Sequence, residues 1–334
     1  MLKINKQVKI KQLPVGIPRE DDFYIEENEI PQIKEGSFLA KSQILSLDPY
    51  VRAVMSGRHF YNAPQSGSLM RSRGVAKVID SLNPKYKKND LVVMETGMQE
   101  YCVSNGDETY FADTGDAPLT TALGVLGMPG LTSYAALLGP ASIKKNDVVL
   151  VSAASGAVGS MVSQIAKIKG GKTIGIAGSD EKCDWCLENA RFDFCINRKK
   201  DDLDRVLSEI APNGVDIFFD NTGGDIQKTV LTKHIADYSR IIISGLMTQY
   251  NVAKAPPGPN LGNIVKMKAT IYGFVVYDFE HMREQFIKDV KGWYADGLIN
   301  FKEDITSGIE TAPEQFIKLM NGNNFGKTLV DVSG

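Results

Sequence analysis

The stretch Val148-Val-Leu-Val-Ser-Ala-Ala-Ser-Gly-Ala-Val-Gly159 decides the fold of this chain. Its first four residues are apolar, as in a parallel strand that is covered on both faces. The strand pattern stops at Ser152, and apolar residues at helical spacing begin at Val158 and continue to Ala166. A strand, a glycine-containing turn and a helix in this order predict the first unit of a doubly wound α/β domain.

The turn carries a dinucleotide-binding fingerprint in which Ala154 replaces the first glycine, while Gly156 and Gly159 remain. Gly156 would let the backbone approach a pyrophosphate, and Gly159 would let helix and strand pack closely. The N–H groups at the helix start, at Ala157 and Val158, would face the negative charge. An ordinary tight turn would explain the glycines alone, but the strand, the helix and the βα repeat downstream together favour a cofactor site.

The rest of the chain supports two domains. Up to about residue 115, short apolar runs separated by Pro, Gly and Asn-Asp turns predict a small barrel-like β domain. Beyond residue 147, strands and helices alternate, as in a doubly wound sheet. The strands expected after the fingerprint unit are 173–177, 194–196, 215–220, 240–244 and 269–277. A proline-rich stretch at 249–259 is too long for an ordinary connection and predicts a functional loop.

Composition excludes several classes of function. Lys and Arg number 38 and Asp and Glu number 40, so the net charge of −2 predicts binding neither to nucleic acid nor to an acidic membrane. No apolar run is long enough to span a bilayer, and the first ten residues lack the apolar core of a signal peptide. We therefore expect a cytoplasmic protein.

Cysteine and histidine residues predict no metal site. Cys183 and Cys186 form a CxxC pair, but it has no second pair and lies in a predicted surface helix, so incidental spacing is the better interpretation. The three histidines are scattered along the sequence. Four cysteines in a chain of 334 residues also make no disulfide framework.

The tip of the second predicted strand indicates which nucleotide binds. An NAD site usually has an acidic residue there for the ribose 2′-OH, whereas this chain has Gly178 and Ser179, with Lys182 one helical turn further on. A neutral tip and a nearby cation favour the 2′-phosphate of NADP. Ser179 also fits a helix cap and Lys182 a solvated face, and Asp180 could still turn inward, so these interpretations stay open together.

Taken together, the motifs resemble those of the zinc-independent medium-chain dehydrogenases/reductases, in the branch of prostaglandin reductase, leukotriene B4 12-hydroxydehydrogenase and the plant double-bond reductases. The matching segments span nearly the whole chain: Leu47-Asp-Pro-Tyr-Val-Arg52, Gly124-Val-Leu-Gly-Met-Pro-Gly-Leu-Thr-Ser-Tyr134, Ser155-Gly-Ala-Val-Gly-Ser160, Ala177-Gly-Ser-Asp-Glu-Lys182, Phe219-Asp-Asn-Thr-Gly-Gly224, Pro256-Pro-Gly-Pro259, Phe274-Val-Val-Tyr277 and Asn324-Phe-Gly-Lys-Thr328. Where zinc-dependent cousins carry Gly-His-Glu-x-x-Gly, this chain has Leu69-Met-Arg-Ser-Arg-Gly74. The catalytic-metal ligands of those cousins are therefore absent.

The resemblance implies a GroES-like β domain, residues 1–120 completed by 300–334, and a Rossmann NADP-binding domain, residues 121–299. It implies that Lys182 binds the 2′-phosphate and that Asn221 and Asn324 touch NADP(H). Relatives have a tyrosine after the asparagine at the exit of the third strand, where this chain has Asn197-Arg198. Arg198 could serve in its place, because a guanidinium can bind phosphate through two hydrogen bonds.

The chemistry that the resemblance implies is NADPH-dependent reduction of the C=C bond of α,β-unsaturated ketones and aldehydes, with prostaglandin-type or lipid-derived enones as candidates. Charge would develop on the carbonyl oxygen, and a tyrosine hydroxyl could stabilise it. Tyr277, predicted at a strand end, is the first candidate, and Tyr50, in the Asp-Pro-Tyr motif, is the second. Each could instead be a packing residue. Arg52 is expected to be structural, pairing with Asp48 or reaching the other domain.

Two alternatives remain at this point: a zinc-free NADPH quinone reductase of the same superfamily, and an NADP-binding sensor without turnover. Fold alone cannot separate these from an enone reductase. Relatives that pair subunits through the edge of the Rossmann sheet suggest a homodimer.

Overall fold

The computed structural model describes residues 4–254 and 256–334, so Met1, Leu2, Lys3 and Ala255, the last in the predicted 249–259 loop, lie outside it. The chain divides into two compact units. Unit 1 joins Met1–Leu123 to Glu303–Gly334, and unit 2 is the intervening Gly124–Lys302. Within the described ranges, no helix combines the length and apolarity needed to cross a membrane.

Unit 2 is built on a parallel sheet of six strands in the order β10-β9-β8-β11-β12-β13. Its strands are β8 (Val148–Ser152), β9 (Lys172–Ala177), β10 (Phe194–Asn197), β11 (Val215–Asp220), β12 (Ile235–Ile243) and β13 (Thr270–Gly273). The order reverses between β8 and β11, which pair directly. In open α/β sheets the ligand binds at such a switch point, outside the carboxyl ends of the strands.

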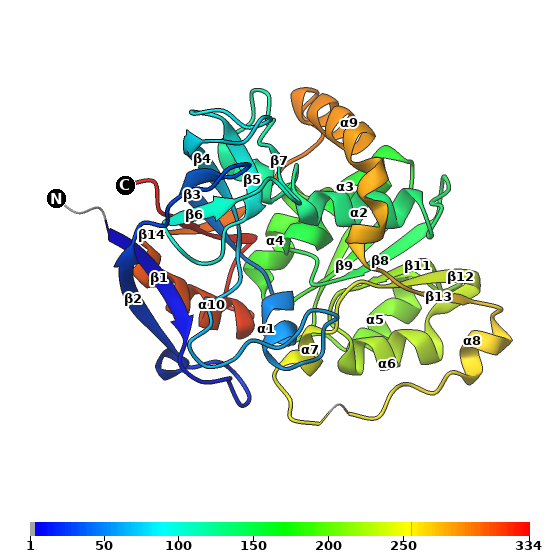
Figure 1. Ribbon diagram of the computed structural model, residues 1–334. Coiled ribbons are helices and arrows are strands. Elements are labelled where there is room, and N and C mark those ends of the chain that lie inside the picture. Colours follow the sequence, from blue (N-terminus) through cyan, green and yellow to red (C-terminus); the bar gives the residue numbers. More distant parts are fainter. Residues whose placement is uncertain (1–3, 255) are drawn as a thin grey trace. The chain divides into compact units, whose positions relative to one another are not determined.

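Helices cover both faces of this sheet (Figure 1). The helices of unit 2 are α2 (Met128–Leu138), α3 (Ala157–Ile168), α4 (Asp180–Glu188), α5 (Leu203–Ile210), α6 (Gly224–Lys233), α7 (Met247–Tyr250), α8 (Gly262–Lys266), η3 (Val276–Met282) and α9 (Arg283–Ala295). On the α5 and α6 face, Leu207 and Val230 pack against Leu150, Phe218 and Ile241 of the strands. The doubly wound Rossmann architecture expected from the sequence is confirmed.

Unit 1 is the β-rich part. A seven-stranded sheet has the order β14-β15-β3-β4-β5-β7, with β6 also pairing β3, and a separate ladder pairs β1 with β2. The strands are β1 (Ile4–Ile10), β2 (Phe23–Glu29), β3 (Phe38–Leu47), β4 (Arg73–Ser81), β5 (Leu91–Glu95), β6 (Tyr101–Ser104), β7 (Tyr110–Phe111), β14 (Glu303–Ser307) and β15 (Lys327–Asp331). The helices are η1 (Glu20–Asp22), α1 (Tyr50–Met55), η2 (Leu119–Leu123), η4 (Ile309–Thr311) and α10 (Ala312–Met320).

Two predicted strands of unit 2 have different bounds in the structure. β12 begins at Ile235 rather than at residue 240, because Ile235 already pairs with Val215 before a register shift. β13 ends at Gly273, so the prediction that the strand continues to Tyr277 is wrong. Phe274 is buried and stacks on Phe279 with ring centroids 4.8 Å apart. The apolar run after Gly273 is therefore a packed connection into η3.

Candidate functional site

The fingerprint turn explains why alanine can replace the first glycine. Ala153 takes a positive φ of 53°, and the N–H of Ala154 donates to the carbonyl of Ile176 at 3.0 Å. The side chain of Ala154 is buried beside β9, and a Cβ on Gly175 would lie 2.8 Å from its methyl group. Because Gly175 on the neighbouring strand has no side chain, the methyl group of Ala154 fits at the position where the usual fingerprint has glycine.

The other two glycines of the fingerprint keep the helix start open. A Cβ on Gly159 would lie 2.4 Å from the carbonyl oxygen of Ala153, so only glycine lets α3 approach the turn this closely. Gly156 is the N-cap of α3 and gives no side-chain cap. The N–H groups of Ala157, Val158 and Gly159 at the first turn have no intrahelical acceptors. The turn therefore fits the pyrophosphate of a dinucleotide.

The tip of β9 gathers the residues expected at the 2′-phosphate. Ser179 caps α4, since its hydroxyl accepts from the N–H of Lys182 at 3.3 Å. Arg198 follows β10 and bonds back through its N–H to the carbonyl of Ala177 at 3.0 Å. Its guanidinium lies over Gly178, where a Cβ would be 3.9 Å from Nε and from one terminal nitrogen. The Arg198 guanidinium thus lies beside a strand tip that bears no acid, and Lys182 follows this tip in the first turn of α4.

The acid closest in sequence to this tip, Asp180, is bound by side chains of β10 and the residues that follow it. Asn197 donates through Nδ2 to one carboxylate oxygen at 2.6 Å, and Lys200 pairs with the other. The hydrogen bond from Lys200, followed by that from Asn197, lowers the pKa of Asp180. Asn197 and Lys200 therefore occupy the Asp180 carboxylate, which could otherwise accept from a ribose 2′-OH. This contact is the physical basis on which the site fits NADP.

A buried hydrogen-bond hub at the switch point positions Asn221. Asp220, at the end of β11, accepts from the Ser152 hydroxyl at 2.8 Å and from Gln227 Nε2 at 2.9 Å. Ser152 in turn accepts from the N–H of Asn221, and Asn221 Nδ2 donates to the Ser152 carbonyl, both at 2.8 Å. The Asn221 carboxamide is thereby fixed at the carboxyl end of the sheet.

Sequence reasoning missed Tyr250, which the fold brings close to this hub. Its hydroxyl accepts from the N–H of Leu246 at 3.3 Å and lies 3.5 Å from where a Cβ on Gly245 would be. The same Cβ would lie 3.1 Å from the Asn221 carbonyl. Burial raises the pKa of Tyr250, which keeps the phenol protonated. Tyr250 falls inside the loop predicted at 249–259. The one sequence feature that could have pointed to it is Gly245, which follows β12 and leaves space for the Tyr250 hydroxyl.

Tyr277 is not at a strand end but in the first turn of η3. Its hydroxyl contacts the sulfur of Met128, at the start of α2, at 4.0 Å. The side chain is half-buried. Tyr277 and the residues predicted to contact the cofactor all belong to unit 2, namely Ala154, Gly156–Gly159, Gly178, Ser179, Lys182, Arg198 and Asn221.

Tyr50 and Asn324 belong to unit 1. Tyr50 is the first residue of α1, and its ring packs against His59 with centroids 5.5 Å apart. Burial, then the negative charges of Glu95 and Asp48, raise its pKa well above the usual range, so this hydroxyl also stays protonated. Asn324 precedes β15, and its Nδ2 donates to the Gly326 carbonyl at 3.0 Å.

A buried ion pair anchors the Asp-Pro-Tyr motif. Lys327 Nζ donates to Asp48 at 2.7 Å and to the Ser46 hydroxyl at 2.6 Å. One expected alternative was that Arg52 pairs with Asp48, but it does not. It donates to the carbonyls of Pro14 at 3.0 Å and Gly16 at 2.8 Å, which supports the structural role.

Among the described residues, the cysteines form no disulfide. Cys183, Cys186 and Cys195 lie close enough for their thiols to interact. Burial raises the pKa of Cys183, whereas hydrogen bonding with Cys186, followed by burial, raises the pKa of Cys195. In the part of the chain that the structure describes, no group of three or more His, Cys, Asp or Glu residues could hold a metal ion.

Comparison with known proteins assigns both parts of the chain. Residues 6–111 match the family model described as the N-terminal domain of oxidoreductase, and residues 157–291 match the one described as zinc-binding dehydrogenase. The NADPH-dependent curcumin reductase of Escherichia coli is 36% identical over 99% of this chain and 97% of its own length. Prostaglandin reductase 1 of Bos taurus is 38% identical, covering 97% of this chain and 98% of its own.

Solved structures agree. CurA of Vibrio vulnificus in complex with NADPH has a TM-score of 0.92 and 35% identity, covering 98% of this chain and 99% of that one. An Escherichia coli quinone oxidoreductase, also complexed with NADPH, reaches a TM-score of 0.80 at 20% identity over 98% of this chain and 100% of that one, which shows a shared fold alone.

Proposed function

Because the chain belongs to the zinc-independent medium-chain dehydrogenases/reductases, in the branch that contains the prostaglandin and curcumin reductases, we propose that it reduces the C=C bond of enones and enals with NADPH. The observation that carries the proposal is the strand tip with Arg198 beside it, Lys182 in the helix that follows, and the Asp180 carboxylate already bound by Asn197 and Lys200. It fits the cofactor that curcumin reductase is named for.

NADPH, when bound, supplies the hydride that goes to the β-carbon of the substrate. What the chain's residues must do is bind and orient. The first-turn N–H groups of α3 take the pyrophosphate, and Lys182 and Arg198 take the 2′-phosphate. Asn221, whose Nδ2 is used by Ser152, presents its carboxamide oxygen as an acceptor. Asn324 of unit 1 is the remaining cofactor contact that we propose.

A hydroxyl donor must meet the negative charge that develops on the substrate oxygen. We assign this role to Tyr277, with Tyr50 as the second candidate. Tyr250 joins them, because its hydroxyl accepts from Leu246 and still has its own proton to donate. Burial holds the pKa values of Tyr50 and Tyr250 above the usual range, so both remain donors at neutral pH.

The test mixes the protein with NADPH and an α,β-unsaturated ketone and follows the loss of reduced-nicotinamide absorbance, with product analysis for the saturated ketone. Turnover of the enone supports the proposal. Turnover of quinones without enones would assign the chain to the quinone reductases, and tight NADPH binding without turnover of either would make it a sensor.

We also propose a homodimer in the cytoplasm. β13 is the outer strand of the six-stranded sheet, and its four residues are exposed, including Ile271 at 39% and Tyr272 at 38%. An exposed edge with apolar side chains is a template for pairing with a second copy. The free thiols support a reducing compartment.

A further inference from the structure

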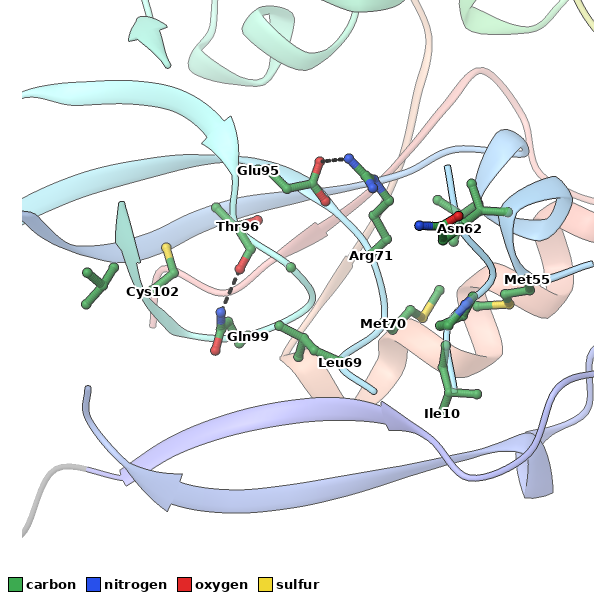
Figure 2. A pocket seen from close by; sticks show the side chains of 15 residues that line it. Ile10, Met55, Asn62, Leu69, Met70, Arg71, Glu95, Thr96, Gln99 and Cys102 are labelled. Atoms are coloured by element: carbon green, nitrogen blue, oxygen red, sulfur yellow. Dashed lines mark hydrogen bonds and ion pairs between the residues drawn. The ribbon is translucent and has the colours of Figure 1, made fainter. Parts of the chain in front are cut away.

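Unit 1 contains a cavity of about 360 Å³ that the proposed chemistry does not use. Ligand sites usually measure ~300–1,000 Å³, so this one can hold part of a small molecule. One wall is apolar and comes from β1, α1 and the segment before β4 (Figure 2). The apolar lining residues are Ile10, Val51, Val54, Met55, Leu69 and Met70.

The other wall is polar and centres on Arg71 and Glu95. A terminal nitrogen of Arg71 lies 3.2 Å from a carboxylate oxygen of Glu95, and the guanidinium carbon lies 3.7 Å from the centre of the Tyr61 ring. Figure 2 shows this pair at one end of the cavity, with Thr96 and Gln99 beside it. Gln99 Nε2 donates to the Thr96 carbonyl at 2.8 Å. Guanidinium stacking and ion pairing hold Arg71 in place.

The cavity has no net charge. Arg71, Glu95 and Cys102 are the ionisable residues among the described residues that line it. Burial raises the pKa of Cys102 to about 12, so its thiol is neutral. Arg71 and Glu95 neutralise each other, and Arg73 nearby has its own partner, Glu108, at 3.6 Å. A ligand carboxylate placed here would meet a cation already paired and the like charge of Glu95.

The same wall leads to the Asp-Pro-Tyr motif. Tyr50 lies close enough to Arg71 and Glu95 for electrostatic interaction with both, and burial, followed by the charge of Glu95, raises the pKa of Tyr50. A neutral oxygen, such as an ester or ketone carbonyl, is compatible with this wall, because it brings no charge into a cavity whose cation and anion are already paired.

We propose that this cavity is the subsite for the part of the substrate remote from the reacting double bond, and that the Arg71–Glu95 pair makes it select uncharged tails over carboxylates. The inference rests on the proposed enone reduction and adds the substrate class. It assigns to Glu95 the exclusion of acids, by like-charge repulsion and by occupying Arg71.

The experiment compares two vinyl ketones that share an alkyl chain of about eight carbons. This length suits the cavity if each water-sized group of the chain takes up about 30 Å³. One ketone ends in a carboxylate and the other in its methyl ester. But-3-en-2-one, which has no tail, tests the proposed function separately. If wild-type protein reduces none of the three, the proposed function fails; if it reduces the short ketone and treats acid and ester alike, only the subsite fails.

We expect wild-type kcat/KM to favour the ester by roughly tenfold or more, the factor that about 1.4 kcal/mol gives. Glu95→Gln keeps the shape and frees Arg71, so the acid-to-ester ratio should rise by roughly tenfold. The double variant Glu95→Gln/Arg71→Met should again favour the ester over the acid, as wild type does. Glu108→Gln removes an exposed acid outside the cavity and should leave the ratio unchanged. An unchanged ratio in Glu95→Gln contradicts the proposal.

A second variant keeps the test independent of the buried pair. Leu69 lines the cavity and is only half-buried, so Leu69→Trp should fill space without replacing a core residue. We expect kcat/KM for the long ester to fall relative to that for but-3-en-2-one, mainly through KM. If the two substrates keep their wild-type ratio, the tail binds elsewhere.

Discussion

At the scale of single residues, the choice between NADPH and NADH depends on contacts that are close in space but distant in sequence. The amide of Asn197 binds the Asp180 carboxylate. Arg198, the next residue, lies over Gly178, so the exit of β10 carries a group that can bind phosphate.

Lys182→Ala should weaken NADPH binding by ~1–3 kcal/mol and leave NADH nearly unchanged, since a charged hydrogen bond to the 2′-phosphate is lost. Titration of both cofactors into both proteins measures this. Lys228→Ala, an exposed lysine on α6, is the matched control and should change neither affinity. Equal losses for NADPH and NADH would remove Lys182 from the phosphate site.

Tyr277→Phe retains the ring and removes only the donor. We expect kcat and kcat/KM to fall together by roughly 10–100-fold, or about 1.4–2.7 kcal/mol, because the interaction strengthens as charge develops on the substrate oxygen. Steady-state kinetics on one enone, with Tyr50→Phe and Tyr250→Phe in parallel, ranks the three hydroxyls. Parent kinetics in Tyr277→Phe would show that this tyrosine is a packing residue.

At the scale of elements, close approach between backbones sets where α3 begins relative to β8 and β9. α3 can begin at the turn after β8 only because Gly159 has no side chain, and β9 accommodates Ala154 only because Gly175 has none. Such contacts set the position of the helix start, and therefore of the N–H groups that face the cofactor.

Gly159→Ala should destabilise unit 2 by ~1–3 kcal/mol, because the new methyl group would lie 2.4 Å from the backbone oxygen of Ala153, which cannot rotate away. Denaturant unfolding monitored by circular dichroism gives the value. Gly292→Ala, inside α9 with no atom within 4 Å of the new Cβ, should instead stabilise by ~0.5–1 kcal/mol. If both substitutions act alike, crowding at the turn is not the cause.

Asp304 joins β14, α10 and the segment that carries Asn324. Desolvation raises its pKa, but Lys318 at 2.8 Å, Gln315 at 2.9 Å and the N–H of Phe325 at 3.1 Å oppose this, and the net pKa is lowered. A lowered pKa contributes stability above the unfolded value of about 3.9, and this contribution is lost as pH falls through the folded value.

Asp304→Asn should therefore reduce stability at pH 7 and flatten the loss of stability below about pH 4, where the wild-type carboxylate takes up its proton. Thermal unfolding at a series of pH values measures both effects. Asp116→Asn, at an exposed position of the same unit, is the control. A parallel pH profile in wild type and Asp304→Asn would contradict the assignment.

Elements with a clear local pattern were predicted well. β11 runs from Val215 to Asp220 as expected, because its apolar run ends at a turn that begins with a buried carboxylate. β13 was overextended, since local hydrophobicity cannot tell a strand from a connection that packs on an aromatic ring. The Arg71–Glu95 pair could not be foreseen either, because the two residues meet only through the pairing of β4 with β5.

At the scale of the whole molecule, we propose that two copies associate through the outer edge of β13. Ile271→Glu should convert the proposed dimer to a monomer, because a charge on the edge opposes strand pairing. Sedimentation velocity measures the outcome, and Val15→Glu, which changes an exposed residue of unit 1, should leave the mass unchanged. A wild-type protein that sediments as a monomer would remove the dimer from the proposal.

The return of the chain to unit 1 also sets the order in which the protein can fold during synthesis. β15 lies between β14 and β3, and its Lys327 is the partner of the buried Asp48. Unit 2 is continuous and can form once residue 302 has left the ribosome, whereas the sheet of unit 1 must wait for residues 327–331. Until then Asp48 lacks its counter-charge and β3 has an open edge. The N-terminal segment is therefore expected to keep an unpaired strand edge for longer during synthesis than the sheet of unit 2 does.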